Sequence, residues 1–184
     1  RSYKQPGMMN QNDHFHQGLF MTISSYDRSC MSEAVALALA AERSGNLPIG
    51  AVISLDGRII ARGQNAIWQP QRSLARHAEI EALKALPVDL LARSGEMTLY
   101  TTLEPCLMCM GAILLHGIGR VVVGAKDPFG GANSVFGSLP PFFKQRLEQT
   151  EWICPAFPVE CDPLFIRIKA LEKINGLDLD LTLP

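Results

Sequence analysis

The first third of the chain carries two successive patterns of apolar positions. A helix is expected over residues 29–43, where apolar residues recur at helical spacing: Met31, Ala34, Leu37, Ala38 and Ala41. Two runs rich in β-branched residues follow, 49–54 and 58–64, and they flank the dipeptide Asp56-Gly57. Because Asp-Gly favours the tight turn of a hairpin, this segment predicts two antiparallel strands.

The rest of the chain alternates between the two periods. Helices are expected over 74–86, 105–116, 141–148 and 163–174, and strands over 97–102, 121–125 and 151–154. Pro105 suits the first turn of its helix, since its missing N–H costs nothing there. Helices that alternate with strands after an initial hairpin predict an α/β fold. We expect a three-layer α-β-α sandwich, a mixed five-stranded sheet with helices on both faces.

The length of 184 residues suits one compact domain. We expect a flexible N-terminal tail over residues 1–26 and a single domain over 27–184. Residues 1–7 precede a Met-Met pair, and we treat them as an appended segment without functional meaning.

Composition narrows the class of protein. Hydrophobic residues make up 47% of the chain and charged residues 19%, as in globular proteins. The net charge of −1 argues against a strongly basic surface, although steering depends on local patches as well. The most apolar stretch, 110–125, is interrupted by His116 and Arg120, so no membrane span is expected. Five cysteines without a regular framework, and no apolar leader, favour a reducing, cytoplasmic location.

Candidate chemistry lies at the starts of two predicted helices. His77 and Glu79 stand in "RHAEIEAL", and Cys106 and Cys109 follow Pro105 in "PCLMC". One His and two Cys are ligand types that zinc prefers, and three protein ligands leave a fourth position for water. Both sulfurs would project from one face near the positive helix N-terminus, which favours thiolates.

Glu79 is two residues from His77, so it could reach a metal-bound water without being a ligand. A zinc-bound water supplies a hydroxide nucleophile near neutral pH, and a neighbouring carboxyl group can take up its proton and deliver protons to a substrate. One Glu beside the water can do both in turn.

Simpler roles compete for several of these residues. The cysteine pair could belong to a structural zinc site completed by Cys154 or Cys161, or form a redox pair. Other positions have structural alternatives: Asn65 and Asp127 as turn residues, Glu104 as a cap for the following helix, and Met108 and Met110 as core residues.

The pattern His-x-Glu…Pro-Cys-x-x-Cys resembles the zinc-dependent cytidine deaminase superfamily, and within it the tRNA adenosine deaminase and guanine deaminase branch. The likeness runs from "PIGAVI" at residue 48 to "GAKDPFGGAN" at residue 133. It implies a cytidine deaminase-like fold and one zinc per chain. It also implies roles for individual residues: His77, Cys106 and Cys109 as zinc ligands, Glu79 as proton shuttle, and Asn65, Asp127 and Ala78 as substrate contacts.

The resemblance implies a nucleobase deaminase that forms a homodimer, with the "MGAILLHG" helix as one candidate for the interface. The likeness is greatest to enzymes that convert adenosine to inosine in the tRNA anticodon loop. Two departures from the family pattern argue against that substrate: Arg76 in "RSLARHAE", and a chain end that is only weakly basic. A free base or nucleoside, such as guanine or cytosine, is the alternative substrate, and a non-catalytic zinc module is the alternative class of protein.

Overall fold

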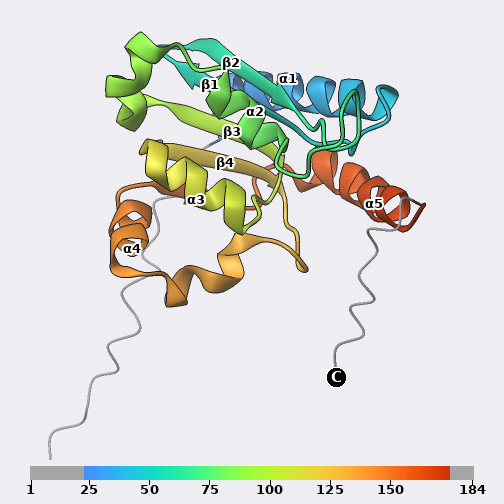
Figure 1. Ribbon diagram of the computed structural model, residues 1–184. Helices are drawn as coiled ribbons and strands as arrows, with labels where there is room; N and C mark the ends of the chain where they lie inside the picture. The colour runs from blue at the N-terminus through green and yellow to red at the C-terminus, as the bar shows by residue number, and fades with distance from the viewer. Residues whose placement is uncertain (1–22, 175–184) are drawn as a thin grey trace, which may run out of the picture.

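The computed structural model describes residues 23–174 and is built around one five-stranded sheet (Figure 1). The strand order is β2-β1-β3-β4-β5. The strands are β1 (Gly50–Leu55), β2 (Arg58–Gln64), β3 (Thr98–Leu103), β4 (Arg120–Ala125) and β5 (Glu151–Ile153). β1 pairs antiparallel with β2 and β3, whereas β3, β4 and β5 run parallel. The predicted mixed sheet is confirmed.

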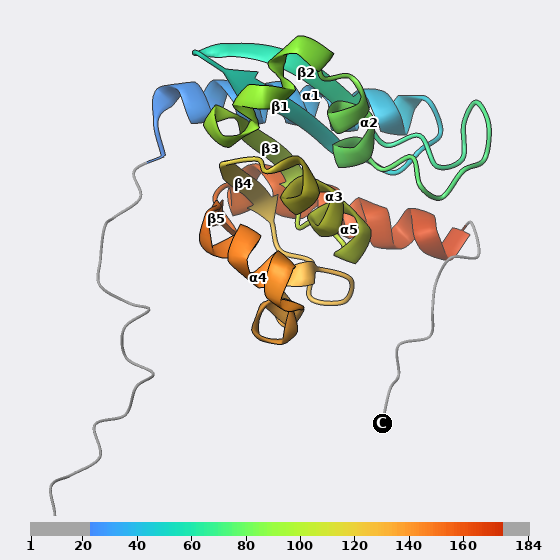
Figure 2. The ribbon, with the colours of Figure 1, turned by 60° about the vertical axis from the view of Figure 1, so that its left-hand side comes forward.

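Helices cover both faces of the sheet, which gives the predicted three layers (Figures 1 and 2). On one face α1 (Ser25–Arg43) packs against β1 and β3, and α5 (Pro158–Ile174) packs against β4. On the other face α2 (Ala78–Lys84) lies over β2 and β1 and contacts α3 (Leu107–His116). The short helix α4 (Pro141–Glu148) packs between α3 and β5.

The first helix begins earlier than its apolar pattern predicted. A capping box starts it: the Ser24 hydroxyl accepts a hydrogen bond from the Asp27 N–H, and the Asp27 carboxylate accepts one from the Ser24 N–H. The helix therefore includes the end of the predicted tail, 1–26, and corrects that boundary. Residues 1–22 lie outside the described part of the chain.

The second helix is shorter than predicted. Residues 74–76 belong to the preceding loop, Leu74 is exposed, and His77 is the N-cap residue. The helix rests directly on Gly63 of β2, where an added Cβ would lie 2.1 Å from the Ala78 carbonyl oxygen. Glycine is required there by space, and this close approach fixes where the first turn of α2 sits.

The predicted starts of two other helices need correction. Pro105 precedes α3 and Cys106 is its N-cap, whereas α5 starts at Pro158 and contains Pro163. Two 3-10 segments, η2 (Val88–Glu96) and η3 (Ala132–Ser138), were not predicted. Each of them buries a single residue, Ser94 in η2 and Ala132 in η3.

The core lies between the central strands and the helices. Strands β1, β3 and β4 are buried almost throughout, since both faces of the sheet are covered. Met110 of α3 is in the core, as predicted, but Met108 is exposed on the outer face of the same helix, so its prediction is wrong. Among residues 23–174, no helix is both long and apolar enough to span a membrane.

Candidate metal centre

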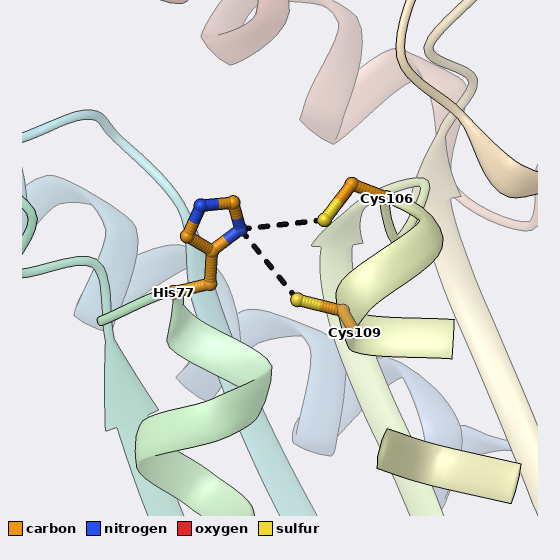
Figure 3. Close-up of side chains that lie close together, drawn as sticks. All are labelled: His77, Cys106 and Cys109. Atoms are coloured by element: carbon orange, nitrogen blue, oxygen red, sulfur yellow. Dashed lines mark hydrogen bonds between the residues drawn. The ribbon is translucent and has the colours of Figure 1, made fainter. Parts of the chain in front are cut away.

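Two helix starts meet beside the end of β3 and bring together three metal-ligand side chains (Figure 3). His77 caps α2, Cys106 caps α3, and Cys109 follows in the first turn of α3. The His77 Nδ1 atom lies 3.6 Å from Cys106 Sγ and 3.5 Å from Cys109 Sγ. All three candidate ligand atoms lie within 4.8 Å of one another. Residues separated by about thirty positions therefore converge on one point, as predicted.

The two thiols of this cluster titrate in opposite directions. A hydrogen bond from Cys109 lowers the pKa of the Cys106 thiol to about 4, and the same contact raises the pKa of Cys109. The hydrogen bond with Cys106 also raises the pKa of His77. Metal binding here would replace the proton that Cys109 holds, because the thiolate is the form that binds metal. The donor set of one imidazole and two thiols fits zinc, and these residues leave one tetrahedral position free.

Glu79 lies next to the three candidate ligands in the first turn of α2. Its side chain is 3% exposed. Its Oε1 atom accepts a hydrogen bond from the Thr101 hydroxyl at 2.9 Å, and its Oε2 atom accepts one from the Cys109 thiol at 3.4 Å. Burial raises the pKa of Glu79. The site therefore contains a carboxyl group that can hold a proton near the metal position. Thr101 was not foreseen, because an alternating strand gives no sign of which residue faces the site.

Asn65 is fully buried at the end of β2. Its Oδ1 atom accepts a hydrogen bond from the Ile67 N–H at 3.3 Å, the contact of a turn residue. Its Nδ2 atom has no hydrogen-bond partner among the described residues. A buried donor without a partner is costly unless a ligand satisfies it. Asn65 thus makes the predicted turn contact, and its predicted role as a substrate contact stays a prediction.

The two acidic residues near the ends of β3 and β4 differ from expectation. The Asp127 Oδ1 atom accepts hydrogen bonds from the backbone N–H groups of Phe129 and Gly130, which is the turn role weighed above. Glu104 does not cap α3. Its carboxylate accepts hydrogen bonds from the backbone N–H groups of Asp127 and Asn133, so that prediction is wrong.

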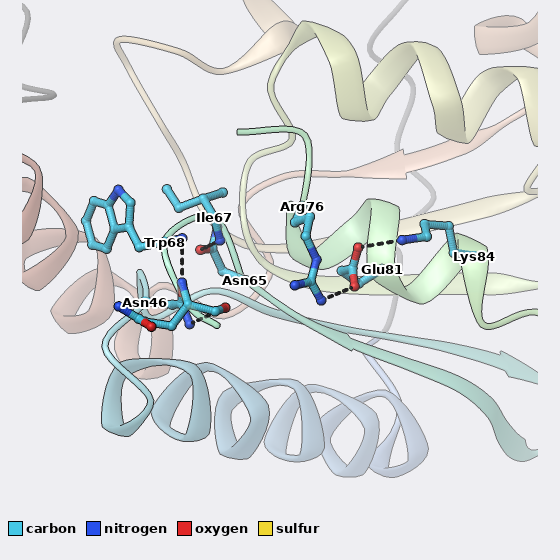
Figure 4. A network of polar contacts seen from close by, with 8 residues as sticks. Asn46, Asn65, Ile67, Trp68, Arg76, Glu81 and Lys84 are labelled. Atoms are coloured by element: carbon cyan, nitrogen blue, oxygen red, sulfur yellow. Dashed lines mark hydrogen bonds and ion pairs between the residues drawn. The ribbon is translucent and has the colours of Figure 1, made fainter. Parts of the chain in front are cut away.

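Ala78 and Arg76 flank His77 and have different surroundings. The Ala78 side chain is fully buried against β2 at the start of α2. Arg76 points along α2 and pairs with Glu81 at 2.9 Å, and Glu81 also binds Lys84 (Figure 4). Arg76 lines a cavity of about 570 Å³ whose wall contains none of the metal-ligand residues. Its charge is therefore held beside the metal centre and not within it.

The alternative of a closed structural zinc site is not supported by the geometry. The Cys154 Sγ atom lies 3.8 Å from a Glu104 carboxylate oxygen, and the Cys161 Sγ atom lies 3.9 Å from Met31 Sδ. Neither thiol joins the cluster around His77, which is the metal-ligand group found within residues 23–174. A fourth cysteine ligand is thus not in place in the described part of the chain.

Comparison with known proteins agrees with this site. Residues 24–125 match the model of the family described as the cytidine and deoxycytidylate deaminase zinc-binding region. The match covers more than half of the chain and includes His77, Glu79, Cys106 and Cys109. The chain belongs to this family, so it is a zinc-dependent hydrolytic deaminase that removes an exocyclic amino group from a nucleobase.

Individual relatives show which deaminases this chain is similar to. The tRNA-specific adenosine deaminase of Bacillus subtilis is 46% identical over 117 residues, which are 61% of this chain and 70% of that protein. A solved structure from work on A-to-I editing by tRNA deaminases at the wobble position is 30% identical. It aligns with a TM-score of 0.60 over 74% of this chain and 99% of that one. The guanine deaminase of Bacillus subtilis is also 30% identical, with a TM-score of 0.50 over 61% and 77% of the two chains.

Proposed function

We propose that this protein converts adenosine to inosine in tRNA. The observation that carries the choice of substrate is the 46% identity to a tRNA-specific adenosine deaminase over 117 residues. The solved tRNA deaminase and guanine deaminase structures are both 30% identical, but the former aligns over more of this chain, 74% against 61%, with a TM-score of 0.60 against 0.50. The aligned 117 residues are long enough to contain the metal ligands and the loops around them. The departure at Arg76 does not oppose this substrate, because the guanidinium is held by Glu81 outside the metal cluster.

The roles of the site residues follow from their positions. His77, Cys106 and Cys109 would hold the zinc ion, which when bound makes a water molecule acidic enough to act as a nucleophile near neutral pH. Glu79 takes a proton from this water and delivers it to the ring nitrogen next to the carbon under attack. A second proton passes through the same carboxyl to the amino group. The C–N bond breaks, a C–O bond remains, and ammonia leaves.

Three residues are proposed to contact the substrate. The Asn65 Nδ2 atom is the strongest candidate, because it is a buried donor that lacks a protein partner in the described part of the chain. Ala78 would act through its position next to His77 at the start of α2, since its own side chain is fully buried. Asp127 would act from the loop after β4, although its Oδ1 atom also serves the turn at Phe129.

The predicted homodimer remains a proposal, and α3 offers a surface for it. Three apolar side chains on the outer face of this helix are exposed: Leu107, Met108 and Leu115. An apolar stripe of this kind is often covered by a partner. If a second copy covers it, Leu115→Lys should give monomers in sedimentation, whereas Ile166→Lys on α5 should not. The cytoplasmic location remains a prediction that accompanies the tRNA substrate.

A panel of substrates tests the proposed function. The zinc-loaded protein is incubated with a tRNA anticodon stem-loop that carries adenosine at the wobble position, and separately with adenosine, guanine, cytosine and cytidine. Inosine is measured by mass spectrometry and ammonia by a coupled assay. We expect inosine in the stem-loop, with binding that weakens as salt is raised. Ammonia from free guanine without any inosine in the stem-loop would refute the tRNA substrate and keep the deaminase.

A further inference from the structure

Glu104 is a buried carboxylate whose two oxygens both bind one loop. The side chain follows β3 and is 6% exposed. Its Oε1 atom accepts a hydrogen bond from the Asn133 N–H at 2.9 Å, and its Oε2 atom accepts one from the Asp127 N–H at 3.2 Å. Asp127 and Asn133 are the two ends of the segment 127–133, called here the rim loop. A single carboxylate thus holds together the two ends of this loop.

The rim loop also runs beside the residues that lead into the metal site. Gly131 forms an antiparallel bridge with Cys106, and the Ala132 N–H donates to the Pro105 carbonyl oxygen at 2.9 Å. The segment that carries a candidate metal ligand is therefore bonded to the rim loop through the backbone. Any shift of the loop changes its position relative to Cys106.

Gly131 shows how closely the loop approaches the carboxylate. A Cβ at this position would lie 2.3 Å from the Glu104 carboxyl group and 2.4 Å from the Asp127 carbonyl oxygen. The backbone angle φ of Gly131 is −70°, which any residue can adopt, so space and not conformation requires glycine. The contact between the rim loop and Glu104 therefore depends on two residues, the carboxyl group of Glu104 and a glycine at position 131.

We propose that Glu104 is a positioning residue for deamination, which sets the rim loop against Cys106 and so places the loop next to the substrate. The proposal rests on the proposed function, because it assumes that the rim loop contacts the substrate. Glu104 acts through the loop and touches neither the metal nor the reacting atoms. The Cys154 thiol, 3.8 Å from Oε2, is too distant to replace either backbone contact.

Two variants remove the contact from opposite sides. In Glu104→Gln the amide keeps the shape of the side chain, but its NH₂ group faces a backbone N–H that needs an acceptor. In Gly131→Ala the new methyl group pushes the loop away. We expect KM for the stem-loop to rise about tenfold in each, the effect of one lost hydrogen bond to a charged acceptor. We expect kcat within about threefold of wild type. Zinc content should be unchanged. The matched control is Glu148→Gln, an exposed acid on α4.

A second readout does not depend on activity. Hydrogen–deuterium exchange at the Asp127 and Asn133 amides should be faster by about tenfold in Glu104→Gln, because both N–H groups lose the charged acceptor. In the double variant Glu104→Gln/Gly131→Ala, the loss of binding free energy calculated from KM should be less than the sum of the two single losses, since both changes break one contact.

The outcomes separate this inference from the proposed function. If wild type does not edit the stem-loop, the tRNA substrate fails, and amide exchange alone judges whether Glu104 holds the loop. If wild type edits the stem-loop but KM is unchanged in both variants, Glu104 has no positioning role. Loss of zinc with unchanged KM would also overturn the inference, because it would assign the carboxylate to the support of Cys106. If Glu104→Gln does not fold, the KM and zinc content of Gly131→Ala decide whether the contact between Glu104 and the rim loop positions the substrate.

Discussion

Asp27 and Glu79 are two buried carboxylates on opposite faces of the sheet, and their surroundings differ in one respect. They are 4% and 3% exposed, so both lose nearly all contact with water. Asp27 has a cation and several donors, whereas Glu79 has one hydroxyl and one thiol. Exclusion from water raises the pKa of a carboxyl group, and the partners then set the outcome: the pKa of Asp27 is held well below its usual range, and the pKa of Glu79 is raised.

The surroundings of Asp27 are those of a structural ion pair. Burial opposes its ionisation, but hydrogen bonds from Arg120, the Ser24 backbone and Tyr100 outweigh that cost. The Arg120 guanidinium lies 2.6 Å from Asp27, and it also pairs with Glu151 at 2.9 Å. This network ties α1 to the starts of β4 and β5. Its buried acid is paired with a cation, so the network serves stability.

The surroundings of Glu79 leave the carboxyl uncompensated. Within residues 23–174, no lysine or arginine forms an ion pair with it. A group in this state can gain and lose a proton as its neighbours change, which is what acid–base catalysis requires. Burial raises the pKa of Glu79, and no basic side chain offsets that effect as Arg120 does for Asp27, so burial without a basic partner distinguishes the functional carboxylate.

The sharpest test of this comparison replaces the functional carboxylate. Glu79→Gln keeps the size of the side chain but removes its ability to move a proton. We expect deamination to fall by about 100-fold to 10,000-fold, because general acid–base catalysis contributes that much. The rate of ammonia release measures the effect. Metal analysis should still find one zinc per chain, since Glu79 is not among the candidate ligands.

The control for that variant lies on the same helix. Glu81→Gln removes a carboxylate two residues away, which binds Arg76 and Lys84 and does not face the metal cluster. Its activity should stay within about threefold of wild type. Comparable losses in both variants would contradict the distinction between the two carboxylates of α2, as would full activity in Glu79→Gln.

A smaller effect, of a different kind, is expected at the structural carboxylate. Asp27→Asn leaves Arg120 partly buried without one of its two acids. We expect the free energy of unfolding to fall by about 3 kcal/mol, the lower end for a broken buried pair, because Glu151 remains. Urea unfolding followed by circular dichroism gives this value. The ratio kcat/KM at saturating zinc should not change, and a loss of activity without loss of stability would reverse the assignment of the two carboxylates.

The smallest expected effect is a change with pH in the stability that the Asp27 carboxylate contributes. A carboxyl with a lowered pKa in the folded state stabilises the protein above its unfolded pKa of about 4. That stabilisation is lost as pH falls below this value toward the folded pKa. The difference in unfolding free energy between wild type and Asp27→Asn should therefore be constant from pH 7 to 5 and shrink below pH 4. A difference that does not vary with pH would show that the Asp27 charge contributes nothing.

The predictions from sequence succeeded where short segments carry their own signal. The alternating and helical periods gave the five strands and the order of the helices, because each element buries one face. They failed at the starts of four helices, whereas the prediction of 141–148 matches α4. Residues 74–76 looked helical because Leu74 fits the apolar spacing, yet the contact of Gly63 with α2 delays the first turn to Ala78. That contact joins residues distant in the chain, so no local pattern reveals it.

The sequence by itself determined the chemistry of this protein: the ligand types at His77, Cys106 and Cys109, and the family to which the chain belongs. Residue identity and spacing suffice for that, because metal preference depends on donor atoms. Only the tertiary structure decided how the remaining polar groups are used. It turned Glu104 from a supposed helix cap into the acceptor for two backbone amides, and it left the Asn65 amide without a partner among the described residues. Hydrogen bonding depends on which atoms meet after folding, and that is a property of the packed chain.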